Sequence, residues 1–343
     1  MQYPGCGLWP WDAQLTRHMA AKQMMRPIRT AFFTFALLGF VPVASNAQPV
    51  LAYVAATDAN PKRLESFKKG LAELGLAEGY NIRLEYREAV LDSEYNGVMA
   101  ELVDRRVDVI LAANVAATRA AARLTKTIPI VMMAVFDPVG IGVVNSLERP
   151  GTNVTGTTMY APHLIGERLR ILKRLNPELD KVAMAVNGQN PNNASQFALL
   201  RAEANKLDIQ TELLDIRTPE DVDLAFKKAL AFGAKGLLNA VDTFINSRRF
   251  ALAAGAAKHK LPFIYSDVEY VMAGGLIALG PGHYEGYYGA AKYVDGILRG
   301  AKPADLPIAG PTEFTMSANR TALKNLGLSL PPDLAGRIDE WIN

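Results

Sequence analysis

Polar, acidic and aromatic side chains stand directly after several short apolar segments, where a strand is expected to end and a loop to begin. In open parallel sheets, ligands bind beyond the carboxyl ends of the strands, next to the N-termini of the following helices. The candidate ligand contacts are therefore Thr57, Asp58, Asn114, Val115, Thr118, Phe136, Asp137, Met159, Tyr160, Asn187, Asn190, Asp242, Phe244 and Asp267. Their carboxylate, amide, hydroxyl and aromatic groups suit noncovalent binding of a small molecule.

One of these positions is a candidate seat for an anion. A helix is predicted to begin near Asn114, and its first backbone amides, with the Thr118 hydroxyl, offer donors to a carboxylate. The alternative interpretation is that Asn114 is an ordinary N-cap.

The acidic candidates also have two interpretations. Asp137 and Asp242 suit pairing with an ammonium group or accepting hydrogen bonds from sugar hydroxyls. Asp137 precedes Pro138, however, and serves equally well as the cap of a turn. Asp267 is favoured as a helix N-cap over a ligand contact.

The aromatic candidates Phe136, Tyr160 and Phe244 suit stacking on a flat ligand, although aromatic residues near strand ends are more often core. An anion seat together with nearby acids suits a zwitterion. We therefore expect a small carboxylate as ligand, an aromatic or other amino acid, with a sugar or nucleoside-type solute as the alternative.

Catalysis finds little support in the sequence. The single Cys, Cys6, precedes residue 48, which leaves no cysteine for disulfides, thiolate chemistry or Cys-based metal sites after that point. His163, His259 and His283 are scattered, and no metal-ligand spacing or nucleophile elbow occurs. We expect a binding protein that is not an enzyme, with no catalytic residues, no metal and no cofactor. The pair Arg248-Arg249 is interpreted as a solvated helix face.

The N-terminal segment has the layout of a secretory leader. Arg26 and Arg29 form a short basic region, an apolar run spans residues 31–43, and small residues follow up to Ala47. An apolar run of this length is too short for a membrane span of about 20 residues. We expect residues 1–47 to be a signal peptide cleaved after about Ala47, with residues 1–24 an artefact of a misplaced start codon, and a periplasmic location. A retained anchor is the weaker alternative.

The charge composition of the chain gives no sign of a surface that binds a polyanion. Four of the 37 Lys and Arg residues and one of the 34 Asp and Glu residues precede Gln48, so the remainder is balanced. Nucleic acid is therefore not expected as a partner.

The elements that position these residues alternate between short apolar strands and amphipathic helices. A first series is predicted with strands at 50–56, 82–86, 107–113 and 128–134 and helices near 60–75, 93–105 and 114–126. A Gly/Thr-rich junction at 148–156 and a linking helix near 163–175 lead to a second series. Its strands are predicted at 182–186, 210–214, 236–239 and 262–265, with helices near 192–206, 219–231 and 245–258.

Two such series predict an α/β protein with two doubly wound parallel-sheet lobes. The tail breaks the pattern, with a strand ending at Leu279, a helix near 284–299, a strand near 314–316 and a C-terminal helix. A chain that completes both lobes in this way crosses between them three times, which makes a hinge. The expected lobes are 48–158 plus about 283–309, and 159–282 plus about 310–343.

Several motifs carry a resemblance to a known family. They are Gly70-Leu-Ala-Glu-Leu-Gly75 with Glu78-Gly-Tyr-Asn81, the segment 102–110, Ile128-Pro-Ile-Val131 with Asp137-Pro-Val139, the segment 146–156, and Gly300-Ala-Lys-Pro-Ala-Asp-Leu-Pro307. In order and spacing the chain resembles the ABC-transporter substrate-binding proteins described for tryptophan, tyrosine or sugars, which have the type I periplasmic-binding fold. The resemblance runs from about residue 50 to the end.

The resemblance implies a monomeric receptor that closes on a small-molecule solute and presents it to an ABC permease in the inner membrane. A ligand sensor for a membrane receptor is the alternative, because it uses the same closure with another partner. The chain departs from its relatives at Asn114-Val-Ala-Ala117 and at Asn187-Gly188. Both segments are expected to face the cleft, so the ligand does not carry over from the family.

Overall fold

The computed structural model describes residues 48–56, 60–89, 92–282 and 284–343. The predicted leader, the candidate contacts Thr57 and Asp58, and His283 lie outside the described residues. The described residues form one compact unit, which contains two sheets.

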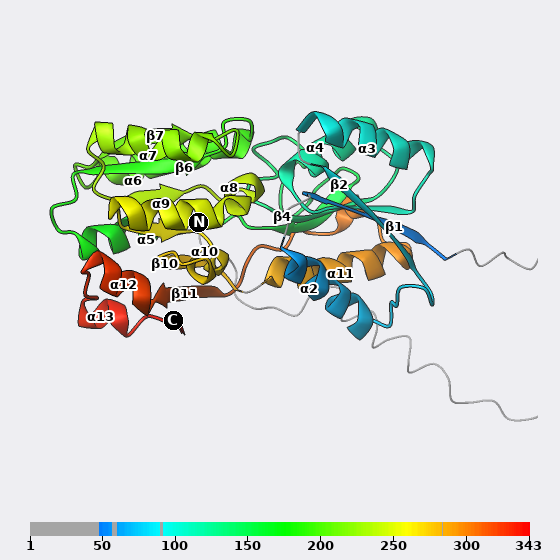
Figure 1. Ribbon diagram of the computed structural model, residues 1–343. Helices are drawn as coiled ribbons and strands as arrows, with labels where there is room; N and C mark the ends of the chain where they lie inside the picture. The colour runs from blue at the N-terminus through cyan, green and yellow to red at the C-terminus, as the bar shows by residue number, and fades with distance from the viewer. Residues whose placement is uncertain (1–47, 57–59, 90–91, 283) are drawn as a thin grey trace, which may run out of the picture. The chain divides into compact units, whose positions relative to one another are not determined.

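The first sheet has five parallel strands in the order β2-β1-β3-β4-β5 (Figure 1). We call this sheet and the helices on it the first lobe. Its strands are β1 (Val50–Ala56), β2 (Arg83–Ala89), β3 (Val109–Ala112), β4 (Ile130–Val135) and β5 (Val154–Thr158), and its helices are α2 (Pro61–Glu73), α3 (Asp92–Asp104), α4 (Val115–Leu124) and α11 (Glu285–Leu298).

Alternation along the strands of the first lobe divides its core between the two faces of the sheet. Val54 and Ile110 pack with residues of α3 and α4 on one face, whereas Tyr53 and Leu111 pack with residues of α2 and α11 on the other. Successive strand side chains point to opposite faces, and each face is sealed by its own helix pair. In this lobe α2, α3 and α4 each begin after the carboxyl end of the preceding strand, which is β1, β2 and β3 respectively.

The second sheet has seven strands in the order β12-β11-β10-β9-β8-β6-β7, and we call it and its helices the second lobe. Its pairs are parallel except β10 with β11, which is antiparallel. The strands are β6 (Lys181–Val186), β7 (Gln210–Asp215), β8 (Leu237–Asn239), β9 (Phe263–Tyr265), β10 (Ile277–Pro281), β11 (Phe314–Asn319) and β12 (Glu340–Ile342). The helices are α5 (His163–Leu175), α6 (Pro191–Asn205), α7 (Asp221–Phe232), α8 (Thr243–Ser247), α9 (Arg249–His259), α10 (Val268–Met272), α12 (Arg320–Leu326) and α13 (Pro332–Ala335).

The chain passes between the lobes at three places. It leaves the first sheet after β5 to enter α5, and returns between β10 and α11, which lies beside α2 (Figure 1). The 3-10 helix Pro303–Asp305 follows, and Ala309 still bonds to the first sheet through Gly156 O at 3.1 Å before β11 joins the second. The predicted class, two doubly wound lobes with a three-crossover hinge, is thereby confirmed. The residue bounds given for the two lobes stay a prediction.

Two predicted helices differ in the structure. The helix expected over 245–258 is two helices, α8 and α9, because the backbone turns at Arg248 (φ −90°, ψ 10°). The single C-terminal helix is α12, α13 and a short edge strand, β12. Gly327 ends α12 in the left-handed region (φ 65°), and Pro332 then begins a new helix instead of continuing the old one.

Two short elements also went unpredicted. The strand β5 overlaps the end of the segment interpreted as a Gly/Thr-rich junction, and α10 follows β9 as one short helix after Asp267. Both have only five residues, and β5 contains Gly156, a weak strand former. Tertiary pairing with β4, not local propensity, makes β5 a strand.

Candidate functional site

A cavity lies between the carboxyl ends of the strands of the two lobes. The first lobe contributes the end of β1 at Ala56, Tyr95, and the first turn of α4 with Arg119. The second lobe contributes Arg217, the loop after β8 with Arg248, and four residues after β6, which are Asn187, Gln189, Asn190 and Pro191. The cavity has a volume of about 80 Å³, room for roughly five water molecules.

The first turn of α4 forms one wall of the cavity. Asn114 caps the helix, since its Oδ1 accepts a hydrogen bond from Ala117 N at 2.8 Å, and its Nδ2 donates to the Tyr95 hydroxyl at 2.8 Å. Val115 and Ala116 line the cavity. Their backbone N–H groups lie at the start of the helix, where no carbonyl one turn earlier can accept a hydrogen bond from them. These amides and the helix dipole favour an anion at this wall.

Three guanidinium groups surround the same space. Arg119 lies on α4 just past its first turn, Arg217 follows β7, and Arg248 follows α8 with its guanidinium 5.0 Å from the centre of the Phe244 ring. Arg217 Nε also donates to Asp215 Oδ2 at 2.7 Å. Among the described residues that line the cavity, Asp242 is the one acid. The balance of charge therefore favours an anionic group of a ligand.

Asp242 is held by a network within the second lobe. Its Oδ2 accepts hydrogen bonds from Asn190 Nδ2 at 2.6 Å and Asn193 Nδ2 at 3.2 Å, and its Oδ1 accepts one from Ile245 N at 2.9 Å. Burial raises the pKa of Asp242 above its ordinary value, and the amide donors around it oppose that rise. Asp242 thus orders the cavity wall and caps α8, in addition to placing one negative charge beside the cavity.

The structure brings six of the candidate contacts predicted from sequence together around this cavity. They come from α4 and from the loops after β6 and β8, and they are Asn114, Val115, Asn187, Asn190, Asp242 and Phe244. Contact with a ligand remains a prediction for each of them.

The other described candidates lie outside the cavity lining, and most of them are engaged in local structure. The Thr118 hydroxyl is buried and donates to Asn114 O at 2.7 Å. Asp137 Oδ1 accepts from Gly140 N, and Asp267 Oδ1 accepts from Glu269 N, each at 2.8 Å. These last two contacts match the capping alternatives given for both acids.

The remaining candidates lie at the first passage between the lobes. Phe136 is buried and packs against Tyr160 edge-to-face, with ring centroids 5.5 Å apart. Met159 N donates to Val135 O at 2.9 Å and ties the passage to β4. Their positions suit core packing near the hinge.

Sequence reasoning missed several lining residues. Arg119 and Tyr95 lie in the interior of helices, and Arg248 belongs to a pair that was interpreted as a solvated helix face. Arg119 occurs five residues after the predicted helix start at Asn114. That spacing was the available signal, because a long side chain this close to the helix N-terminus can reach the strand ends.

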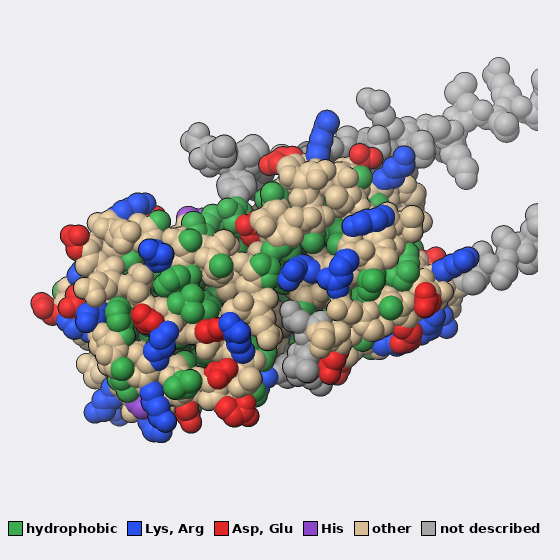
Figure 2. Space-filling view, turned by 90° about the horizontal axis from the view of Figure 1, so that it is seen from above, with side chains coloured by type: hydrophobic (Ala, Val, Ile, Leu, Met, Phe, Trp, Pro, Cys, Tyr) green, Lys and Arg blue, Asp and Glu red, His purple; other side chains and the backbone are tan. Residues whose placement is uncertain are grey.

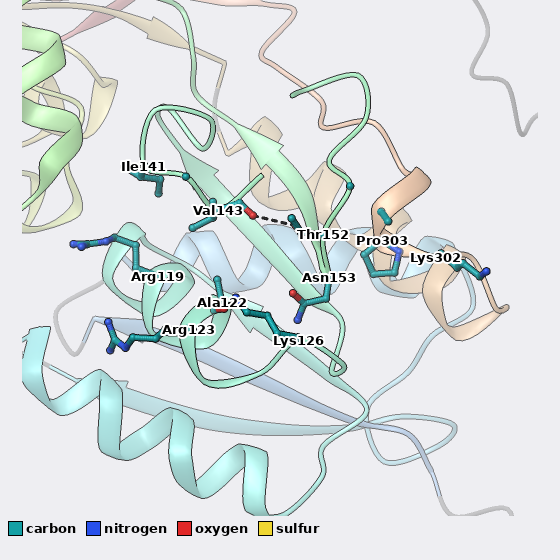
Figure 3. A pocket seen from close by; sticks show the side chains of 13 residues that line it. Arg119, Ala122, Arg123, Lys126, Ile141, Val143, Thr152, Asn153, Lys302 and Pro303 are labelled. Carbon is teal, nitrogen blue, oxygen red and sulfur yellow. Dashed lines mark hydrogen bonds between the residues drawn. The ribbon is translucent and has the colours of Figure 1, made fainter. Parts of the chain in front are cut away.

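A second hollow lies on the first lobe alone (Figure 3). Arg119 and Arg123 project from α4 along one side, and Lys126 follows the end of that helix. Lys302 and Pro303 border the hollow from the 3-10 helix segment. Figure 2 shows several Lys and Arg side chains on this part of the surface, over α3 and α4. All of its lining comes from one lobe, so closure of the two lobes cannot enclose a ligand there. The interlobe cavity is the better candidate site.

Within the described residues, no group of three or more His, Cys, Asp or Glu side chains is placed to hold a metal ion. Over the same residues, no helix combines the length and the apolar character needed to cross a membrane.

Comparison with known proteins places the chain in a family. The profile described as "ABC transporter substrate binding protein" matches residues 50–341. A tyrosine-binding protein of Clostridioides difficile (strain R20291) is 30% identical over 268 residues, which cover 78% of this chain and 77% of that protein. The chain belongs to the ABC transporter substrate-binding protein family, a family of binding proteins and not of enzymes.

Solved structures share the fold. A conserved domain protein of Vibrio cholerae O1 biovar El Tor superposes with a TM-score of 0.81 at 25% identity, over 86% of this chain and all (100%) of that one. The ABC domain of Streptococcus pneumoniae, solved in complex with L-Trp, has a TM-score of 0.81 at 20% identity with the same coverage. The two-lobed architecture is that of type I periplasmic-binding proteins.

Proposed function

We propose that this protein is an exported receptor that closes on a small carboxylate, an aromatic or other amino acid, and delivers it to an ABC permease. The observation that carries the proposal is the composition of the interlobe cavity. It combines the N-terminal turn of α4 from the first lobe with the guanidinium groups of Arg217 and Arg248 from the second. A carboxylate held there is bound by both lobes at once, and only the closed arrangement offers both sets of donors.

The rest of the cavity supports an amino acid as the ligand. Asp242 supplies a negative charge for an ammonium group, and Phe244 and Tyr95 supply aromatic surface for a side chain. The relative from Clostridioides difficile is named for tyrosine binding. Tyrosine and tryptophan are therefore the first ligands to test.

Export and delivery belong to the same proposal. The basic and apolar pattern before Gln48 supports a leader cleaved after about Ala47 and a periplasmic location. Family membership supports an inner-membrane permease as partner. A monomer suffices, because both walls of the cavity come from one chain.

Thermal unfolding in the presence of matched ligands tests the ligand class. L-Tyrosine or L-tryptophan at about 100 times its Kd stabilises the folded state by about 2.7 kcal/mol, a rise in Tm of about 5 °C for a protein of this size. Tyramine, which has the ring and ammonium group of tyrosine without its carboxylate, should give a much smaller rise. A rise with glucose or a nucleoside, and none with any amino acid, would reject the proposed ligand class.

A further inference from the structure

A buried ion pair joins the two lobes outside the candidate cavity. Arg63 lies in the first turn of α2, in the first lobe, and Glu269 lies on α10, in the second. Arg63 Nη2 is 3.1 Å from Glu269 Oε2, and Arg63 Nε donates to Glu269 Oε1 at 3.3 Å. The two residues are 8% and 2% exposed, so the pair is shielded from water. This two-point contact is the strongest type of side-chain ion pair.

Further contacts hold the Arg63 guanidinium from both lobes. Nη2 donates to Asn246 Oδ1 of α8 at 3.0 Å, in the second lobe. Nη1 donates to the hydroxyl of Tyr287 of α11 at 3.4 Å, and the guanidinium lies 5.6 Å from the centre of that ring, in the first lobe. Burial alone would lower the pKa of Arg63, but Tyr287 and Glu269 raise it above its ordinary value. Arg63 therefore stays charged inside the contact.

The contact is sensitive to separation of the lobes. Neither Arg63 nor Glu269 lines the candidate cavity. When the lobes move apart, each charge regains water, and the pair no longer forms. When they close, each charge loses water and has the other as its counterion. If one partner is removed, the remaining charge is buried without a counterion in the closed arrangement, but not in the open one.

We propose that Arg63 and Glu269 set the balance between the open and closed arrangements of the lobes, and thereby tune the affinity for solute without touching it. The expected effect on ligand affinity rests on the proposed function, whereas the expected effect on the separation of the lobes does not. A smaller closed population weakens the apparent affinity in proportion.

The experiment measures the distance between the lobes in the ligand-free protein. The full chain, with Cys6→Ser to remove its one thiol, carries Glu88→Cys on β2 and Asp223→Cys on α7 as exposed attachment points for spin labels. The variants are Glu269→Gln, Arg63→Met and the double variant Arg63→Met with Glu269→Leu. Asp295→Asn is the matched control, because it breaks the pair between Asp295 on α11 and Arg299, the C-cap of that helix (2.8 Å), and touches only one lobe.

Each single variant should shift the distance distribution toward longer separations and raise the Kd for the bound amino acid by about tenfold. In the double variant, the distance distribution and the Kd should both return most of the way to those of the parent, because no buried charge is left unpaired. The Asp295→Asn control should behave as the parent chain. If a single variant does not fold, the double variant and the control carry the test, and the double variant is then expected to resemble the parent.

Two results would overturn the proposal. One is an unchanged distance distribution in the folded single variants. The other is a double variant as open as either single variant. Because the distances are measured without ligand, this result is separate from the proposed function. If the parent chain binds no amino acid, the ligand class is wrong, whereas the distances still decide the role of the ion pair.

Discussion

At the scale of single residues, Arg119 distinguishes the interlobe cavity from the hollow on the first lobe. Arg119 lines both, whereas Arg123, one turn later on the same helix, lines only the hollow. Arg119→Met should raise the Kd for L-tyrosine by about tenfold, the size expected for an exposed charge-assisted contact, and Arg123→Met should leave it unchanged. Titration calorimetry on both variants measures this. If both substitutions raised the Kd equally, the ligand site would be assigned to the hollow on the first lobe.

Asp242 gives a dependence on pH that belongs to the same scale. Its pKa is raised in the folded protein, so ionised Asp242 disfavours folding at neutral pH, and this penalty is relieved as the pH falls through the folded pKa toward about 4. Asp242→Asn does not titrate and gains no such relief. The free energy of unfolding of the variant, relative to that of the parent, should therefore fall between pH 7 and pH 4. Urea unfolding across this range measures the difference, and a constant difference would contradict the assignment.

At the scale of elements, the pairing of β4 with β5 depends on one glycine. Gly156 has φ 129°, and a Cβ there would lie 2.1 Å from Met132 O and 2.8 Å from Met132 N. Gly156→Ala should therefore lower the free energy of unfolding by about 3 kcal/mol or more, through backbone strain and overpacking.

Gly289, inside α11, is the matched control for that substitution. A Cβ there meets only Thr157 Cγ2, at 3.8 Å, an ordinary contact. Gly289→Ala should leave the stability unchanged or raise it by about 0.5–1 kcal/mol. Urea unfolding of both variants compares them, and equal losses would mean that the close approach to Met132 is not the cause.

At the scale of the whole molecule, three passages of the chain let two separately cored lobes share one cavity. The first passage follows β5, and Thr158 fixes it through hydrogen bonds from its hydroxyl to Val135 O at 2.6 Å and Phe136 O at 2.9 Å. Each lobe has buried clusters on both faces of its own sheet, and the cavity between the strand ends is lined by both polar and apolar residues.

The sequence by itself determined the two series of strands and helices and the helix start at Asn114. Local rules carry this information, because apolar periodicity and caps depend on neighbours within a few residues. Position after a strand also selected six residues of the cavity lining. Short elements such as β5 and α10 were beyond these rules, because five residues give too weak a pattern.

Only the tertiary structure decided which polar residues meet. Arg63 and Glu269 are separated by 206 residues, and nothing near either one in the chain marks it as the partner of the other. Arg119 and Arg248 lie in helical segments whose patterns fit a solvated surface equally well. Their roles depend on where the first lobe faces the second, and that arrangement follows from long-range packing and the three passages, which no local sequence pattern encodes.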